Sequence, residues 1–146
     1  MMTREDAVNF LLKKPYKLGH LIGFSLLTTL HNEWIIDMIK GTEDKTLQAH
    51  RGSYKTTCVS LALALIIILL PRTKTLFIRK TDDDVKEVIA QVQKILKSQQ
   101  VRYFVKCIYG VDLKLTKESA TEVNTNLSTD IKGTSQLVGM GTGSSL

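Results

Sequence analysis

The fold of this chain is decided by residues 47–70, which read LQAHRGSYKTTCVSLALALIIILL. Within this stretch, residues 58–70 contain Ser60 as their only polar side chain, and the run ends at Pro71. A helix needs about 20 apolar residues to span a bilayer, and these 13 residues are too few. We therefore expect a buried helix over residues 56–70, and a membrane anchor over 58–70 is the less favoured alternative.

The residues on both sides of this run predict an α/β protein. Residues 46–49 and 74–79 have the character of short strands, and residues 82–97 have the apolar repeat of an amphipathic helix. Its apolar residues are Val85, Val88, Ile89, Val92, Ile95 and Leu96. Thr81 and the aspartates of residues 82–84 stand at the start of this helix. There they can accept hydrogen bonds from its free amide groups, and their negative charge interacts favourably with the helix dipole. An alternation of strands and helices is typical of the α/β class.

The N-terminal region is expected to be helical. Thr3 caps a first helix that Pro15 ends, a turn-rich stretch follows, and residues 29–40 form a second helix with Gly41 as its C-cap. A charged connector then leads into the core. We place the boundary there, with an N-terminal helical segment over residues 1–43 and a core over residues 44–146.

The C-terminal region is less regular. Residues 111–116 and 121–126 alternate around a polar turn and predict a hairpin or two edge strands. The glycine-rich stretch at residues 139–143 has the wrong spacing for a dinucleotide fingerprint and predicts a flexible loop. A chain that stops in such a loop is expected to hold an incomplete domain.

Composition narrows the class of protein. The formal net charge of +6 is compatible with a polyanionic partner. Arg72, Lys74, Arg79 and Lys80 flank the strand at residues 75–78, where they either contact DNA or serve solubility. Two cysteines without metal-ligand spacing indicate neither a disulfide scaffold nor a zinc site. The polar N-terminus is not a secretory signal, so a cytoplasmic location is expected.

The loop at residues 49–56 has the layout of a phosphate-binding loop between a strand and a helix. In that interpretation Lys55 neutralises phosphate charge and the Thr56 hydroxyl holds magnesium. Ala49 and Tyr54 stand where the GxxxxGK(S/T) pattern has glycine, so the pattern itself is not matched. The alternative is a basic turn in which Lys55 and Thr56 only begin a buried helix.

Residues 47–57, 77–85 and 133–136 together resemble the ATPase domain of phage and prophage terminase large subunits. The resemblance covers most of the chain and implies a P-loop NTPase with a RecA-like parallel sheet flanked by helices. It implies ATP and Mg²⁺ as cofactors, and a role in driving double-stranded DNA into a capsid. The residues that it implies are Arg51 and Lys55 for catalysis, Gly52, Ser53, Tyr54, Lys55, Thr56 and Thr57 for the nucleotide, and Thr56 for the metal.

The resemblance also places an adenine-contacting residue at His31, although a solvent-facing residue at the start of a helix is the favoured interpretation. Hydrolysis in this family needs a second apolar strand that ends in an aspartate, and the sequence shows no such strand. The aspartates of residues 82–84 are better explained as helix-capping residues.

Three functions remain open at this point. The first is the ATP-binding part of a packaging motor in the host cytoplasm, with double-stranded DNA, a portal protein, a small terminase subunit and further copies of the chain as partners. The second, favoured for this polypeptide alone, is a truncated prophage product that binds nucleotide without hydrolysing it. The third is a small membrane-associated protein.

Overall fold

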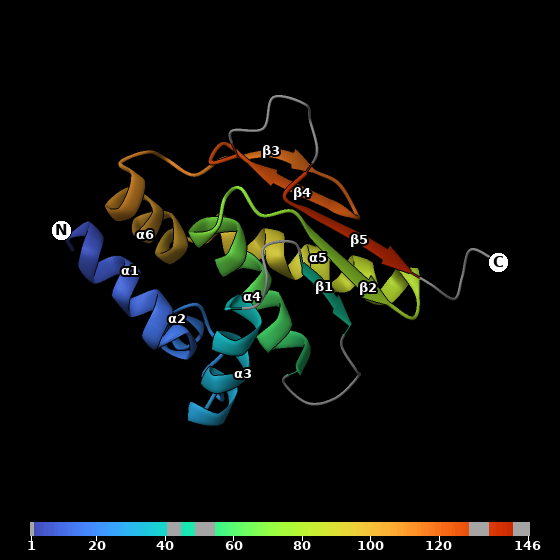
Figure 1. Cartoon of the computed structure of the whole chain (residues 1–146), viewed down its shortest axis with the longest axis horizontal. Helices are drawn as coiled ribbons and strands as arrows, with labels where there is room; N and C mark the ends of the chain where they lie inside the picture. The colour runs from blue at the N-terminus through green and yellow to red at the C-terminus, as the bar shows by residue number, and fades with distance from the viewer. Residues whose placement is uncertain (1, 41–44, 49–54, 129–134, 142–146) are drawn as a thin grey trace.

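The computed structural model describes residues 2–40, 45–48, 55–128 and 135–141, and it confirms a mixed α/β protein (Figure 1). The described helices are α1 (Arg4–Lys13), α2 (Pro15–Leu21), α3 (Thr29–Ile39), α4 (Lys55–Leu69), α5 (Asp82–Lys97) and α6 (Gln99–Tyr109). The described strands are β1 (Lys45–Gln48), β2 (Thr75–Arg79), β3 (Leu115–Glu118), β4 (Glu122–Thr125) and β5 (Leu137–Gly141).

The strands form one sheet in the order β1-β2-β5-β4-β3. Strands β1, β2 and β5 run parallel, whereas β4 is antiparallel to both β5 and β3. The sheet is therefore mixed, whereas the resemblance implies a parallel one. The antiparallel part comes from the β3–β4 hairpin, which confirms the hairpin predicted near residues 111–126.

Helix α4 is the centre of the fold, as the apolar run predicts. Every residue from Cys58 to Ile68 is buried, including Ser60, whose hydroxyl donates to the Thr56 carbonyl at 2.9 Å. Helices α3 and α5 both pack against α4. Figure 1 shows α4 between the N-terminal helices and the sheet. In the described part of the chain, no helix has the length and apolar character needed to cross a membrane.

Helix α5 has the bounds that the sequence predicts, and it packs on the sheet. Its apolar side chains are buried, and α5 contacts β2 and β5. At Gly139 of β5, an added Cβ would overlap Val85 of α5, so only glycine allows this approach of helix and strand.

Two predictions for the remaining segments are wrong, and one helix was not predicted. Part of the turn-rich stretch is helix α2, which Pro15 begins at a position where its missing N–H costs nothing. Helix α6 lies where no element was predicted, between an N-cap at Ser98 and a left-handed C-cap at Gly110. The stretch predicted as a glycine-rich loop, residues 139–143, overlaps the last three residues of β5, a strand inside the sheet. Gly41, the predicted C-cap of the second helix, lies outside the described residues.

The N-terminal helices share the core of the other elements. The Phe10 ring of α1 stacks on the Phe104 ring of α6 with centroids 5.2 Å apart, and buried side chains of α1, α2 and α3 belong to the same apolar cluster as α4. Thr3 caps α1, as predicted, by accepting a hydrogen bond from the Asp6 backbone N–H at 3.1 Å. The boundary at residue 43 stays a prediction.

Gln136 joins α4 to the antiparallel part of the sheet. Its side chain is fully buried, and its amide nitrogen donates to the carbonyls of Ile67 and Pro71 at 3.0 and 3.2 Å. Its amide oxygen accepts from the backbone N–H and the hydroxyl of Thr125 at 3.0 and 2.7 Å. One side chain thus satisfies four polar groups, three of them buried, and two of the four lie at the C-terminal end of α4 and in the turn after it.

The change Gln136→Met tests this junction because it keeps the volume and removes all four hydrogen bonds. We expect the free energy of unfolding to fall by about 3 kcal/mol or more, since each of the three fully buried groups left without a partner costs about 1–3 kcal/mol. Urea unfolding measures the loss, and Gln100→Met, on the exposed side of α6, is the control. Equal stability of the two variants would contradict this role of Gln136.

Candidate phosphate-binding site

The predicted loop stands in the sequence between β1 and α4, and α4 begins at the carboxyl edge of the parallel strands. Strands β1 and β2 are parallel neighbours and α4 connects them, so the first turn of α4 lies near the edge where both strands end. Ligands of open α/β sheets bind at this edge. Four of the predicted site residues, Arg51, Gly52, Ser53 and Tyr54, lie outside the described residues.

The first turn of α4 contains the other predicted loop residues. The helix begins at Lys55, Thr56 and Thr57 are partly exposed, and this turn has no acidic residue. The backbone N–H groups at the start of a helix have no partner within the helix, and they carry partial positive charge. This turn can therefore bind an anion, and the roles of its side chains stay predictions.

Arg79 is a residue of this site that the sequence analysis placed wrongly on the surface. It is the last residue of β2, its side chain is only 5% exposed, and its Nη2 donates to the Thr56 hydroxyl oxygen at 3.1 Å. The guanidinium carbon lies 5.8 Å from the centre of the Phe77 ring. The signal that the sequence analysis missed is the alternation of side chains between the two faces of a strand. Arg79 is in phase with the core residues Thr75 and Phe77, which predicts a buried position.

The other basic residues around β2 differ from Arg79. Arg72 and Lys80 are exposed, and Lys74 is partly exposed. Contact of these three side chains with DNA stays a prediction.

The aspartates of residues 82–84 lie in the first turn of α5, where negative charge suits the helix dipole, and a capping role of their side chains stays a prediction. Thr81 is the N-cap, and its hydroxyl accepts a hydrogen bond from the Asp84 backbone N–H at 3.2 Å. Asp82 lies against Gly141, the last residue of β5. Among residues 2–40, 45–48, 55–128 and 135–141, no three His, Cys, Asp or Glu side chains are grouped to hold a metal ion. The Thr56 hydroxyl, the expected magnesium ligand, is the oxygen to which Arg79 donates.

His31 caps its own helix in the structure. The ring Nδ1 accepts a hydrogen bond from the Thr28 backbone N–H at 2.9 Å, and the ring lies edge-on to Trp34 with centroids 5.3 Å apart. His31 lies in the first turn of α3, as the favoured interpretation predicts, and its side chain is partly exposed. A contact with adenine stays a prediction.

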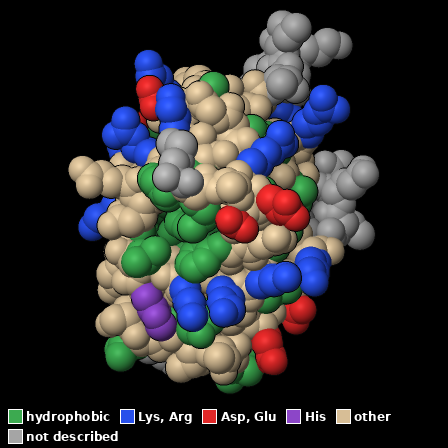
Figure 2. Space-filling view, turned by 90° about the vertical axis from the view of Figure 1, so that its left-hand side faces the viewer, with side chains coloured by type: hydrophobic (Ala, Val, Ile, Leu, Met, Phe, Trp, Pro, Cys, Tyr) green, Lys and Arg blue, Asp and Glu red, His purple; other side chains and the backbone are tan. Residues whose placement is uncertain are grey.

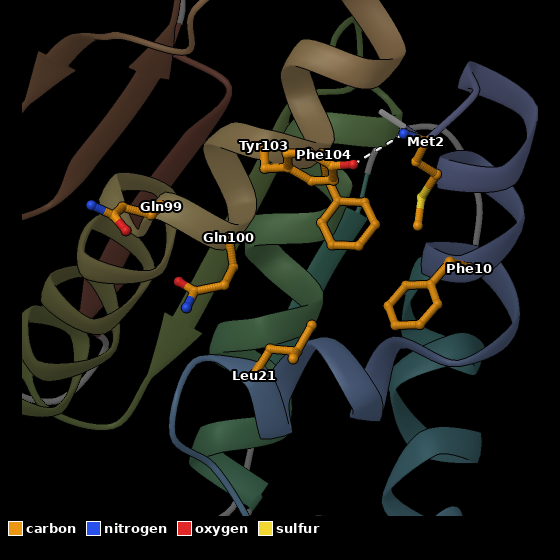
Figure 3. Close-up of a pocket in the computed structure, with 7 residues that line it drawn as sticks. All are labelled: Met2, Phe10, Leu21, Gln99, Gln100, Tyr103 and Phe104. Atoms are coloured by element: carbon orange, nitrogen blue, oxygen red, sulfur yellow. Dashed lines mark hydrogen bonds between the residues drawn. The ribbon is translucent and has the colours of Figure 1, made fainter.

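An apolar hollow lies between α1, α2 and α6. It has a volume of about 600 Å³ and is lined by Met2, Phe10, Leu21, Gln99, Gln100, Tyr103 and Phe104, which Figure 3 shows around the gap. Figure 2 shows hydrophobic side chains gathered on this face with Lys and Arg side chains around them. Of the predicted nucleotide-binding residues, those that the structure describes do not line this hollow, and its apolar walls do not suit a phosphate.

Two groups, one in α4 and one in contact with it, have raised pKa values. Burial raises the pKa of the Cys58 thiol to about 11. Burial also raises the pKa of Tyr109, against a smaller opposing effect of Arg4. The Tyr109 hydroxyl donates to the Ile68 carbonyl at 2.5 Å, which requires the protonated phenol.

Comparison of the chain with protein-family models, with curated proteins and with solved structures gave no significant match.

The Thr81 cap can be tested by two substitutions. We expect Thr81→Ala to lower the free energy of unfolding by about 1 kcal/mol, because the Asp84 N–H loses its side-chain partner. Thr81→Ser keeps the hydroxyl and should retain most of the stability. Urea unfolding of the two variants makes the comparison, and an equal loss in both would contradict the capping role.

Thiol labelling at pH 8 tests the burial of Cys58. A pKa of about 11 leaves only roughly a thousandth of the thiol as thiolate at this pH, and the thiolate is the reactive form. We expect a disulfide reagent to label Cys107, which is partly exposed, in the native protein and to label Cys58 only after unfolding. The variant Cys107→Ser isolates Cys58, and its rapid labelling in the native state would contradict the expectation.

Proposed function

We propose that this chain is the ATP-binding part of a DNA-packaging motor of the terminase large-subunit class. The observation that carries the proposal is the parallel unit β1–α4–β2, in which the helix begins at Lys55 and Thr56 beside the buried guanidinium of Arg79. A strand, a loop and a helix in this order are the context that a phosphate-binding loop requires. The sequence resemblance supplies the family.

Each predicted residue has a role in this proposal. The ammonium group of Lys55 neutralises phosphate charge, and the free amides of the first turn of α4 donate to phosphate oxygens. Arg51 lies in the loop and assists catalysis, and Gly52, Ser53 and Tyr54 contribute backbone amides. His31 contacts the base. The Thr56 hydroxyl oxygen, which accepts from Arg79, has a second lone pair and would hold magnesium, which would supply further positive charge to the phosphates.

The partners follow from the class of motor. We propose double-stranded DNA, a portal protein, a small terminase subunit and further copies of this chain as partners, in the cytoplasm of a bacterial host. The net charge of +6 supports a polyanionic partner.

Titration calorimetry with ADP and magnesium tests nucleotide binding. We expect Lys55→Ala to weaken binding by about 1.5–3 kcal/mol, the usual range for hydrogen bonds to charged groups. This loss is roughly a ten- to hundredfold change in Kd. The control is Lys86→Ala, which removes an exposed lysine from α5.

Equal affinity of the wild type, Lys55→Ala and Lys86→Ala would overturn the assignment of the site. Phosphate release from ATP by the same three proteins, with and without double-stranded DNA, separates a motor from a protein that only binds nucleotide. Release that DNA stimulates and Lys55→Ala abolishes supports the motor.

A further inference from the structure

The hollow between α1, α2 and α6 exposes apolar side chains that the fold leaves uncovered. Among the residues that line it, Leu21 is 55% exposed and Tyr103 is 43% exposed, although α2 and α6 both bury other side chains in the core. Figure 3 shows Phe10, Leu21 and Phe104 pointing toward the gap between these helices. Exposed apolar side chains gathered at one hollow are typical of a surface that binds a partner.

Contacts between the helices hold the walls of the hollow in place. The ring of Phe10 stacks on the ring of Phe104 with centroids 5.2 Å apart, and the ring of Tyr103 lies edge-on to Phe104. The Tyr103 hydroxyl accepts a hydrogen bond from the Met2 backbone N–H at 3.0 Å, which joins the segment before α1 to α6. The hollow is therefore formed before a partner binds, and binding costs little ordering of its walls.

The segments around the hollow carry most of the excess positive charge of the chain. Residues 2–21 and 99–109 together contain six basic and two acidic side chains, a net charge of +4 out of the +6 of the whole chain. The two acidic residues, Glu5 and Asp6, lie in the first turn of α1.

Three exposed cations stand one helical turn from lining residues, so they lie beside the hollow: Lys13 in α1, Lys17 in α2 and Arg102 in α6. Figure 2 shows Lys and Arg side chains around the apolar ones on this face. Within residues 2–40, 45–48, 55–128 and 135–141, none of the three forms an ion pair. The hollow thus has an apolar centre and a positively charged rim, which complements an acidic partner.

An acidic amphipathic helix suits this surface better than other occupants. The cations of the rim come from three different helices, so an occupant with carboxylates on both sides of an apolar stripe can pair with several of them. A free anionic lipid has its charge at one end and meets cations on one side only. A second copy of this face would bring like charges together.

We propose that the hollow between α1, α2 and α6 is the docking site for an acidic amphipathic helix of a partner protein. Apolar side chains of the partner enter the hollow beside Leu21 and Tyr103, and its carboxylates pair with Lys13, Lys17 and Arg102. The described residues of the proposed nucleotide site do not line the hollow, so this docking site is independent of nucleotide binding.

Fluorescence anisotropy of the full chain with a labelled peptide tests the docking site. The probe is a peptide of about 18 residues, or five helical turns, with leucine on one face and glutamate on the other. One control peptide has lysine in place of every glutamate, and a second has the probe's composition in scrambled order. We expect the glutamate peptide to bind about tenfold more tightly than either control peptide, because only it matches both the hollow and its rim.

Two pairs of variants locate the bound peptide. Leu21→Ser should raise its Kd about tenfold, whereas Leu30→Ser, which changes a leucine of similar exposure (53%) that does not line the hollow, should change the Kd less than about twofold. Lys17→Glu should weaken binding more than Lys86→Glu, which makes the same change on α5.

Three results would overturn the docking site: equal binding of the glutamate and lysine peptides, equal effects of Leu21→Ser and Leu30→Ser, or absence of binding at about 1 mM glutamate peptide. Phosphatidylglycerol vesicles are the second probe. If the chain binds these vesicles and not the peptide, and Leu21→Ser weakens that binding, the hollow belongs to a membrane contact and the docking site for a helix is overturned as well.

Discussion

The burial of α4 on all sides is the constraint on which the rest of the structure depends. A helix with one apolar face can lie at a surface, whereas the residues from Cys58 to Ile68 must be covered in every direction. Helices α3 and α5 supply much of that cover. The buried end of α4 also needs partners for its last carbonyl groups. Gln136 and Tyr109, which are distant in sequence, donate to the carbonyls of Ile67 and Ile68.

The same constraint determines where the first turn of α4 lies. Because the body and the C-terminal end of α4 are held by neighbouring elements, its N-terminus has a fixed place at the edge where β1 and β2 end. Arg79 reaches this turn from β2, and the 3.1 Å contact with Thr56 links strand and helix directly. The proposed anion site is therefore built on regular elements of the core, which suits precise recognition better than a loop alone.

Much of this arrangement could be predicted from the sequence, because the responsible signals are local. The apolar period of α5 gave its bounds, and the uninterrupted run gave a buried α4. Helix α6 was missed although Val101, Phe104, Val105 and Ile108 have helical spacing. Ser98 is both the end of α5 and the cap of α6, so the two helices follow each other without the loop residues that mark a new element.

The predictions that failed concern residues whose environment comes from distant parts of the chain. The glycines of β5 have a composition typical of loops, but Gly139 lies under Val85, where a Cβ would overlap that side chain. The charge of Arg79 is typical of a surface, but its partner Thr56 lies 23 residues earlier in the chain. Propensity describes one residue and its neighbours in sequence, whereas these two positions are determined by packing between elements.

The two helices that begin at this edge of the sheet show how the fold separates two electrostatic environments. At Gly141 a Cβ would overlap Asp82, so β5 brings the acidic start of α5 close to the sheet edge. An anion that approaches this edge meets carboxylates at α5 and a guanidinium at α4. The helix dipole favours an anion at both N-termini, but the neighbouring side chains oppose it at α5 and reinforce it at α4. Under the proposed function, the aspartates therefore exclude phosphate from the start of α5, which leaves the start of α4 as its place.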